Sequence, residues 1–246
     1  MKTYGLRGYP LGHSFSRGYF TDFFERENID AEYKNFELPC IEMLSEVLLS
    51  ESTLQGFNVT IPYKQQVFAY LDELDEAAQA IGAVNVVKVS RHDDKVRLKG
   101  YNTDHIGFSN SIRPFLKPHH THALILGTGG ASKAVDYALR QMGLKTLYVS
   151  RTAREGIVSY DELTPEIMKQ YTVIVNTTPL GMHPKIDECP PLDYTLLTPA
   201  HLLYDVVYNP EKTLFLQQGE VNGTSLCNGM EMLIGQAKAA WHIWNE

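Results

Sequence analysis

The chain has few cysteines and no long apolar segment. Only 3 of its 246 residues are cysteines, and Cys40, Cys189 and Cys227 lie far apart. An odd number of distant cysteines predicts neither a disulfide framework nor a Cys-x-x-Cys metal site, and it fits a reducing compartment. No run approaches the roughly 20 apolar residues of a membrane-spanning helix, and the first residues lack the apolar core of a signal peptide. We therefore expect a cytoplasmic protein without a membrane segment.

The chain also lacks an excess of positive charge. Its 22 Lys and Arg residues are outnumbered by 29 Asp and Glu residues, for a net charge of -7. This balance disfavours a broad surface for nucleic acid or anionic lipid, although a local cationic pocket stays possible. With 43% hydrophobic residues, the chain can bury a substantial core in one large or two small domains. We expect a small-molecule ligand, no nucleic acid partner, and a monomer or homodimer.

The first hundred residues alternate strand-like and helix-like segments. The strand-like runs are 3–8, 32–37 and 56–59, and the helix-like ones are 16–28, 41–49 and 64–80. Two closely spaced apolar runs, 83–89 and 96–100, flank a polar stretch and predict a hairpin. This pattern predicts an N-terminal α/β domain with a mixed sheet.

A helical pattern over 104–115 leads into a connector rich in histidine, and we expect the domain junction at about 104–118. The connector holds His119, His120 and His122. These could suggest a metal cluster, but no further ligands recur at a suitable spacing. We interpret the segment as a solvated connector and expect no metal.

After the connector the alternation resumes. Strands are expected at 122–126, 146–149, 172–176 and 201–206, and helices at 132–142 and 160–169. This order is typical of a doubly wound sheet. A last helix is expected from Gly229 to Trp244, because Met232, Gln236 and Ala240 recur at helical spacing.

A glycine turn follows the apolar run Leu124–Leu126. Its residues are Gly127, Thr128, Gly129, Gly130 and Ala131. A strand that runs into Gly-x-Gly-Gly brings backbone amides against a pyrophosphate, so the turn predicts a dinucleotide site. The third glycine of the fuller Gly-x-Gly-x-x-Gly pattern is Ser132 here.

The end of the next expected strand indicates which dinucleotide is bound. An acidic residue there would meet a free ribose hydroxyl, but this chain has Ser150, Arg151, Thr152 and Arg154. Two guanidinium groups and two hydroxyls suit a 2′-phosphate, whereas a carboxylate would repel it. The sequence therefore predicts NADP rather than NAD.

Three segments of the first half carry polar groups at the ends of expected elements. Ser14 and Ser16 lie in the loop 12–16 before a helix, Asn58–Lys64 ends a strand, and Gly100–Asp104 ends the hairpin. Taken singly, each has an ordinary structural reading as a helix cap, a strand end or a surface lysine.

Together with the glycine turn, these segments resemble the shikimate dehydrogenase family. The family pattern of Ser-x-Ser, Asn-Val-Thr-x-Pro-x-Lys, Gly-Ala-Val-Asn, Gly-x-Asn-Thr-Asp and Gly-x-Gly-Gly-Ala occurs in order at 14–16, 58–64, 82–85, 100–104 and 127–131. Further on, 176–182 looks like the family's loop beside the nicotinamide, 205–210 like its next strand end, and 229–237 like its closing helix.

The resemblance implies reversible NADPH-dependent reduction of 3-dehydroshikimate to shikimate, a step of chorismate and aromatic amino acid biosynthesis. It implies a substrate-binding and catalytic domain of 1–104 and 226–246, a Rossmann-like NADP-binding domain of 105–225, and an active site in the interdomain cleft. Ser14 and Ser16 would hold the substrate carboxylate. The substrate hydroxyls would be held by Thr60, Asn85, Asp104 and Gln236, with Tyr208 also in the substrate site. Thr177, Thr178 and Gly229 would join the glycine turn and the segment 150–154 around the cofactor.

Lys64 and Asp104 would be the catalytic pair. Oxidation of a secondary alcohol releases a proton from oxygen as hydride leaves carbon, so a nearby group must accept that proton. Partial burial would lower the pKa of a lysine, whereas a neighbouring carboxylate would raise it. Either residue can carry the proton on this reasoning, and Asp104 can equally orient the substrate hydroxyl and hold Lys64.

The chain departs from the family pattern at several positions. Arg17-Gly18-Tyr19-Phe20 stands where the family usually has Pro and then His-Asn, Ser150 replaces Asn, His105 replaces a common Gly, and the segment between Arg154 and Tyr171 is short. Arg17 and His105 leave the choice between shikimate and quinate open. Two alternatives therefore remain, a quinate/shikimate dehydrogenase that accepts NAD and a non-catalytic NADP-binding regulatory protein.

Overall fold

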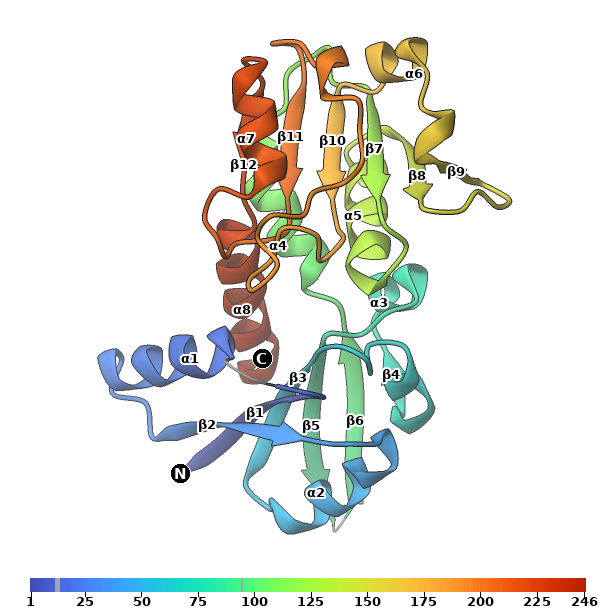
Figure 1. The fold of residues 1–246 in the computed structure, drawn as a ribbon. Helices are drawn as coiled ribbons and strands as arrows, with labels where there is room; N and C mark the ends of the chain where they lie inside the picture. Colours follow the sequence, from blue (N-terminus) through green and yellow to red (C-terminus); the bar gives the residue numbers. More distant parts are fainter. Residues whose placement is uncertain (12–13, 94) are drawn as a thin grey trace. The chain divides into compact units, whose positions relative to one another are not determined.

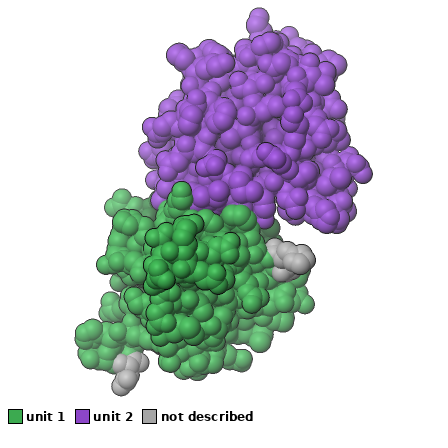
Figure 2. Space-filling view, turned by 90° about the vertical axis from the view of Figure 1, so that its left-hand side faces the viewer, with its two compact units in different colours: residues 1–103, 237–246 green, residues 104–236 purple. Residues whose placement is uncertain are grey.

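The computed structural model describes residues 1–11, 14–93 and 95–246. Residues 12 and 13 of the expected Ser14 loop lie outside the described residues. The described chain forms two compact units, coloured separately in Figure 2: the first contains 1–103 and 237–246, and the second contains 104–236. Residues 226–236, which we expected with the first domain, group with the second unit.

The first unit is built on a six-stranded mixed sheet in the order β2-β1-β3-β5-β6-β4 (Figure 1). Its strands are β1 (Lys2–Gly8), β2 (Ala31–Glu37), β3 (Leu54–Val59), β4 (Glu73–Leu74), β5 (Val86–His92) and β6 (Lys95–Tyr101). β1 pairs in parallel with β2 and β3, whereas β5 pairs antiparallel with β3 and β6. The predicted hairpin and mixed sheet are thus confirmed.

Helices cover both faces of this sheet. One face packs against α1 (Phe15–Arg26) and the end of α8 (Met230–Asn245) through aromatic and aliphatic side chains. The other packs against η1 (Ile41–Met43), α2 (Leu44–Ser50), η2 (Gln66–Tyr70) and α3 (Glu76–Ile81). Trp244 lies directly on the sheet: its indole nitrogen donates to Val87 O at 3.1 Å, and a Cβ on Gly56 would lie 2.3 Å from its ring. Burial of these apolar faces is the main stabilising contribution.

The prediction of one helical stretch over 64–80 was wrong. The structure instead places a turn, the 3₁₀ helix η2, the short strand β4 and the helix α3 there. Asp75 explains the late start of α3, because its carboxylate accepts from the amides of Ala77 and Ala78 at 3.3 and 3.0 Å. An aspartate is more stabilising as such an N-cap than inside a helix.

The second unit contains a six-stranded parallel sheet in the order β12-β11-β10-β7-β8-β9. Its strands are β7 (His122–Leu126), β8 (Lys145–Ser150), β9 (Ile157–Ser159), β10 (Val173–Asn176), β11 (Leu202–Asp205) and β12 (Ser225–Cys227). Counted within this unit, the order is 6-5-4-1-2-3, the doubly wound arrangement of Rossmann folds. The predicted α/β class is confirmed.

Helices also lie on both faces of the parallel sheet (Figure 1). Side chains of α4 (Asp104–Ile112), α5 (Gly130–Gln141) and the start of α8 fill one face, and those of α6 (Pro165–Gln170) and α7 (Leu214–Val221) fill the other. Short 3₁₀ helices η3 (Arg113–Phe115), η4 (Tyr160–Glu162) and η5 (Tyr194–Leu196) join these elements. The expected helix 160–169 is interrupted, because Thr164 caps a new helix that begins at Pro165.

The histidine connector is partly buried, which corrects our expectation of a solvated segment. His120 is only 5% exposed: its Nδ1 accepts from Lys117 N at 3.0 Å, and its Nε2 lies 3.0 Å from Ala200 O. His119 is exposed. Within 1–11, 14–93 and 95–246, no group of three or more His, Cys, Asp or Glu side chains is placed to hold a metal ion. In those same ranges, no helix is both long and apolar enough to cross a bilayer.

Candidate active site

The first candidate substrate residues lie at the start of α1. Ser14 is the N-cap of this helix, and its hydroxyl accepts from Arg17 N at 3.2 Å. Ser16 follows in the first turn and is half-buried. Amides at the N-terminus of a helix favour an anion, so both serines stand where a carboxylate can be bound. The capping role and the binding role of Ser14 are compatible, because a hydroxyl that accepts one hydrogen bond can still donate another.

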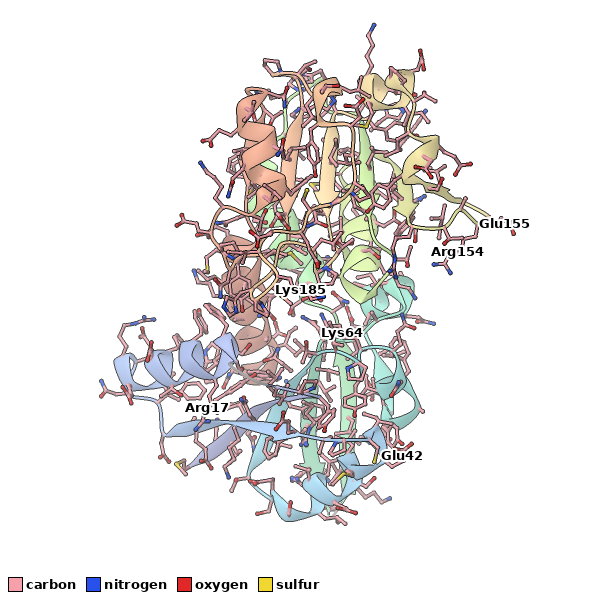
Figure 3. The ribbon with its side chains drawn as sticks, viewed as in Figure 1. Arg17, Glu42, Lys64, Arg154, Glu155 and Lys185 are labelled. Carbon is pink, nitrogen blue, oxygen red and sulfur yellow. The ribbon has the colours of Figure 1, made fainter. Side chains whose placement is uncertain are left out.

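Thr60 and Lys64 follow the carboxyl end of β3. Thr60 N donates to Arg7 O at 2.8 Å and so extends the pairing of β1 with β3. Lys64 lies in the turn that follows (Figure 3), and its carbonyl accepts from Val84 N at 2.8 Å. The Lys64 side chain is half-buried. This backbone bond places Lys64 beside the segment that carries Asn85.

Asn85 is 3% exposed and joins two strand ends. Its Oδ1 accepts from Thr103 N at 2.6 Å, and its Nδ2 donates to Thr103 Oγ1 at 3.0 Å. Thr103 directly precedes Asp104 in the chain. The side chain of Asn85 therefore holds the backbone immediately before the second candidate catalytic residue.

A buried hydrogen-bond chain continues from Asn85 toward α1. Asn58 Nδ2 donates to Asn85 O at 3.4 Å, and the Tyr33 hydroxyl donates to Asn58 Oδ1 at 2.7 Å. Burial raises the pKa of Tyr33 well above its ordinary value, and a side-chain hydrogen bond with Ser16 opposes that rise. The structure thus brings Ser16 and Asn85 into one network. Tyr33 had no assigned role in the sequence, because nothing in its local pattern distinguishes it from another buried strand residue.

Asp104 and Gln236 lie on two helices of the second unit that pack closely. Asp104 begins α4 and is 7% exposed, and Gln236 on α8 is 8% exposed. One turn into α4, a Cβ on Gly107 would lie 2.3 Å from Met232 O and 2.8 Å from Gln236 N. Only a glycine permits this approach of the two backbones, which brings the helices that carry Asp104 and Gln236 together.

The glycine turn has the geometry expected of a phosphate-binding loop. Gly127 has φ +107°, a conformation that disfavours other residues, and its amide donates to Val149 O at 2.9 Å. Gly129 caps α5, and an added Cβ there would meet no atom within 4 Å. The first turn of this 12-residue helix, which begins at Gly130, therefore presents amides toward the open space beside Gly129. Ala131 follows within that turn.

The structure brings one of the two candidate arginines to the glycine turn. Arg154 Nη2 donates to Thr128 Oγ1 at 3.3 Å, and the Arg154 backbone is paired with Ile157. Arg154 lies in the loop between β8 and β9 (Figure 3). Arg151 and Thr152 are exposed just after Ser150, the last residue of β8. Burial raises the pKa of Tyr160 to about 12, and the positive charge of Arg151 acts in the opposite direction by lowering that pKa.

Thr177 and Thr178 pack against the same turn. Thr177 donates to Leu126 O through both its amide, at 2.9 Å, and its hydroxyl, at 2.6 Å. A Cβ on Gly127 would lie 2.8 Å from Thr177 Oγ1 and 3.1 Å from Thr178 Cγ2. The threonine pair and the glycine turn thus form one continuous surface at the carboxyl ends of β7 and β10, where ligands of doubly wound sheets bind.

Tyr208 and Gly229 lie near the end of β11. Tyr208 is half-buried, and burial raises the pKa of its hydroxyl. Gly229 N donates to Val207 O at 3.2 Å, and a Cβ on Gly229 would lie 2.1 Å from Val206 O. Gly229 therefore serves the close packing of the β11 end against the start of α8.

Comparison with known proteins assigns the chain to a family. The model of the shikimate dehydrogenase substrate binding domain matches residues 6–87. The shikimate dehydrogenase (NADP(+)) of Clostridium beijerinckii is 39% identical over 100% of this chain and 93% of its own length. Among solved structures, the Thermus thermophilus shikimate 5-dehydrogenase in complex with NADP(H) and shikimate has a TM-score of 0.86 at 28% identity, covering 99% of this chain and 93% of that one. A quinate dehydrogenase from Corynebacterium glutamicum in complex with NAD has the same TM-score, 0.86, at 26% identity, with coverage of 99% and 93%. The chain belongs to the shikimate dehydrogenase family.

Proposed function

We propose that the protein is an NADP-dependent shikimate dehydrogenase that reversibly reduces 3-dehydroshikimate to shikimate. One observation carries the cofactor choice: the Arg154 guanidinium lies on Thr128 of the glycine turn, where a cofactor with a 2′-phosphate gains a charged partner. Full-length similarity to relatives named shikimate dehydrogenase (NADP(+)) supports the same activity.

The proposed domain roles follow the two compact units except at residues 104 and 226–236, which group with the second unit. We propose that 1–104 and 226–246 form the substrate-binding and catalytic domain, and that 105–225 form the NADP-binding domain. The match of the substrate binding domain model to 6–87 supports the first assignment. The parallel sheet with its open glycine turn supports the second.

The cofactor fits the residues of the second unit. The backbone amides at the start of α5 suit a pyrophosphate. A Cβ on Gly129 would occupy the open space in front of these amides, where the pyrophosphate would bind. Arg151, Thr152 and Arg154, with Ser150, would hold the 2′-phosphate end. Thr177, Thr178 and Gly229 would line the nicotinamide end. When bound, the cofactor supplies or accepts a hydride.

The first unit supplies most of the substrate contacts. Ser14 and Ser16 would bind the carboxylate at the start of α1, and Thr60 and Asn85 would bind ring hydroxyls. Asp104, Gln236 and Tyr208 would complete these contacts. The buried network through Tyr33 and Asn58 keeps Ser16 and Asn85 in place before substrate arrives.

Lys64 and Asp104 are the proposed catalytic pair. In the oxidation direction, one of them takes the hydroxyl proton of shikimate, and in reduction the Lys64 ammonium polarises the ketone. Lys64→Ala should therefore lower kcat by at least about 100-fold while the Kd for NADPH stays within about twofold. Steady-state rates and NADPH fluorescence titration measure the two quantities. Loss of NADPH binding in a folded Lys64→Ala protein would refute the role.

Initial rates with two substrates and two cofactors test the proposed function. Shikimate and quinate are each paired with NADP+ and NAD+, and reduced cofactor is followed by absorbance. Rapid turnover with only shikimate and NADP+ is expected. Faster turnover with quinate or with NAD+ would support the alternative of a quinate/shikimate dehydrogenase. The structural similarity to a quinate dehydrogenase favours testing this alternative. Tight NADPH binding without turnover would support a regulatory protein.

The cellular setting is part of the proposal. We expect a cytoplasmic enzyme, since the three cysteines are unpaired in the structure and suit a reducing compartment. A monomer or homodimer is expected, with no nucleic acid or membrane partner. Light scattering at micromolar protein concentration measures the molar mass in solution. A mass above that of a dimer would contradict the expected oligomeric state.

A further inference from the structure

The proposed mechanism does not use one buried carboxylate, which lies next to the proposed cofactor-binding residues Thr177 and Thr178. Asp205, the last residue of β11, is 0% exposed. It accepts three hydrogen bonds, from Thr213 Oγ1 at 2.6 Å, Val207 N at 3.0 Å and Asn176 Nδ2 at 3.0 Å. Among the ion pairs of the described residues, none includes Asp205. Burial raises its pKa to about 6, and the same three hydrogen bonds oppose the rise. At neutral pH the group is an acceptor surrounded by donors.

The carboxylate determines which end of the Asn176 amide faces it. Asn176 is also 0% exposed, and its NH2 group points to Asp205 because an ionised carboxylate can only accept. The amide oxygen must then point the other way, where it accepts from Thr178 N at 3.0 Å and Thr178 Oγ1 at 2.6 Å. Thr178 in turn packs beside Gly127 of the glycine turn.

The same carboxylate holds a second loop. Val207 N donates a hydrogen bond to the Asp205 carboxylate, which orients the backbone directly before Tyr208. The Thr213 hydroxyl also donates to the Asp205 carboxylate, and this bond holds the start of α7. Thr213 also lies against Gly181, which ends the segment 177–181 that we call the threonine loop: a Cβ on Gly181 would lie 3.4 Å from Thr213 Cβ. One buried charge thus joins two loops that end neighbouring strands.

We propose that Asp205 is a positioning residue that fixes the Asn176 amide and thereby holds Thr177–Thr178 and the loop before Tyr208 in the geometry that binds the cofactor. This inference rests on the proposed function, since it takes the threonine loop to be part of the NADP site. A buried hydrogen bond to a charged group is worth more than a neutral one, and its loss leaves the partner unsatisfied.

Asp205→Asn tests the inference with little change of volume. The variant keeps one acceptor oxygen and places an NH2 group either beside Thr213, whose hydroxyl must then accept instead of donate, or beside the Asn176 amide, so the side chain at 205 no longer imposes one orientation on the network. We expect the Kd for NADPH and the KM for NADP+ to rise about tenfold. The KM for shikimate should stay within about twofold, and circular dichroism should remain that of the wild type.

Thr213 provides a second pair of variants in case Asp205→Asn folds poorly. Thr213→Val removes one donor to the carboxylate without touching the proposed cofactor residues, and we expect a threefold to tenfold rise in the Kd for NADPH, or about 0.7–1.4 kcal/mol. Thr213→Ser keeps the hydroxyl and should restore wild-type binding. A purely structural role would lower the melting temperature of Thr213→Val and leave the Kd unchanged.

Asp136→Asn is the matched control in the same unit. Asp136 on α5 accepts from Thr146 and Arg140, neither of which belongs to the proposed cofactor site, so its variant should lose stability without a change in the Kd for NADPH. The inference is overturned if folded Asp205→Asn and Thr213→Val bind NADPH like the wild type, or if Asp136→Asn weakens binding equally.

The wild type separates this inference from the proposed function. If it binds NADPH but does not oxidise shikimate, and Asp205→Asn weakens that binding, the activity is refuted and the positioning role stands. If the wild type binds no NADPH, both are refuted.

Discussion

Two glycines of the same turn should respond oppositely to alanine, because only one of them has room for a Cβ. Gly127 has φ +107°, and a Cβ there would lie 2.8 Å from Thr177 Oγ1, which is itself held by Leu126 O. Gly129 has φ −82° and ψ −171°, and a Cβ there would meet no atom within 4 Å. The first substitution strains the fold, whereas the second only fills the space in front of the α5 amides.

The structure sets the size of each effect. For Gly127→Ala, the strained backbone costs about 1–3 kcal/mol, and displacement of Thr177 costs roughly another 1 kcal/mol through its hydrogen bond. The melting temperature should fall by roughly 5–15 °C. Gly129→Ala should change the free energy of unfolding by less than about 1 kcal/mol, since its conformation suits alanine. It should weaken NADPH binding about 10- to 100-fold, by the loss of one charge-assisted hydrogen bond.

Differential scanning fluorimetry and NADPH fluorescence titration on both variants give the two readouts. The expected result is a destabilised Gly127→Ala and a stable Gly129→Ala that binds NADPH poorly. If stable Gly129→Ala binds NADPH as tightly as the wild type, the amides of this turn do not hold the pyrophosphate. A wild-type melting temperature for Gly127→Ala would refute the packing argument.

Three further predictions concern the cofactor, the substrate network and pH. Arg154→Ala should raise the KM for NADP+ about tenfold and leave the KM for NAD+ unchanged. If initial rates showed that both KM values rise equally, Arg154 would not contact the 2′-phosphate. Tyr33→Phe leaves the buried Asn58 Oδ1 without its 2.7 Å donor and should cost about 1–3 kcal/mol in urea unfolding. It should also raise the KM for shikimate and not that for NADP+, whereas an unchanged shikimate KM would show that the network does not serve the substrate site. Burial lowers the pKa of His120 below 6.5 in the folded protein, so the unfolded chain takes up the proton first as pH falls. The contribution of His120 to the free energy of unfolding should then decline from about pH 6.5 downward, so the wild type should lose stability relative to His120→Asn over that range, and parallel pH profiles of the two proteins would exclude a role of His120.

Local patterns predicted most of the fold. The hairpin, the parallel sheet and the glycine turn each leave a continuous signal in apolar spacing or in glycine position. The sequence missed β9 and β12, which have three residues each, and the helix α7. Such short strands show no alternation, and they exist because a neighbouring strand supplies their hydrogen bonds.

The sequence by itself determined the order of the motifs, the family and the candidate residues, because these depend on residue types at fixed spacing. Only the tertiary structure decided how distant side chains cooperate. Asn58 meets Asn85, and Asn176 meets Asp205, across 27 and 29 positions of the chain. These contacts form where one strand ends and its neighbour begins or ends at the same edge of a sheet, so the direction of each amide is set by a partner that no local pattern predicts.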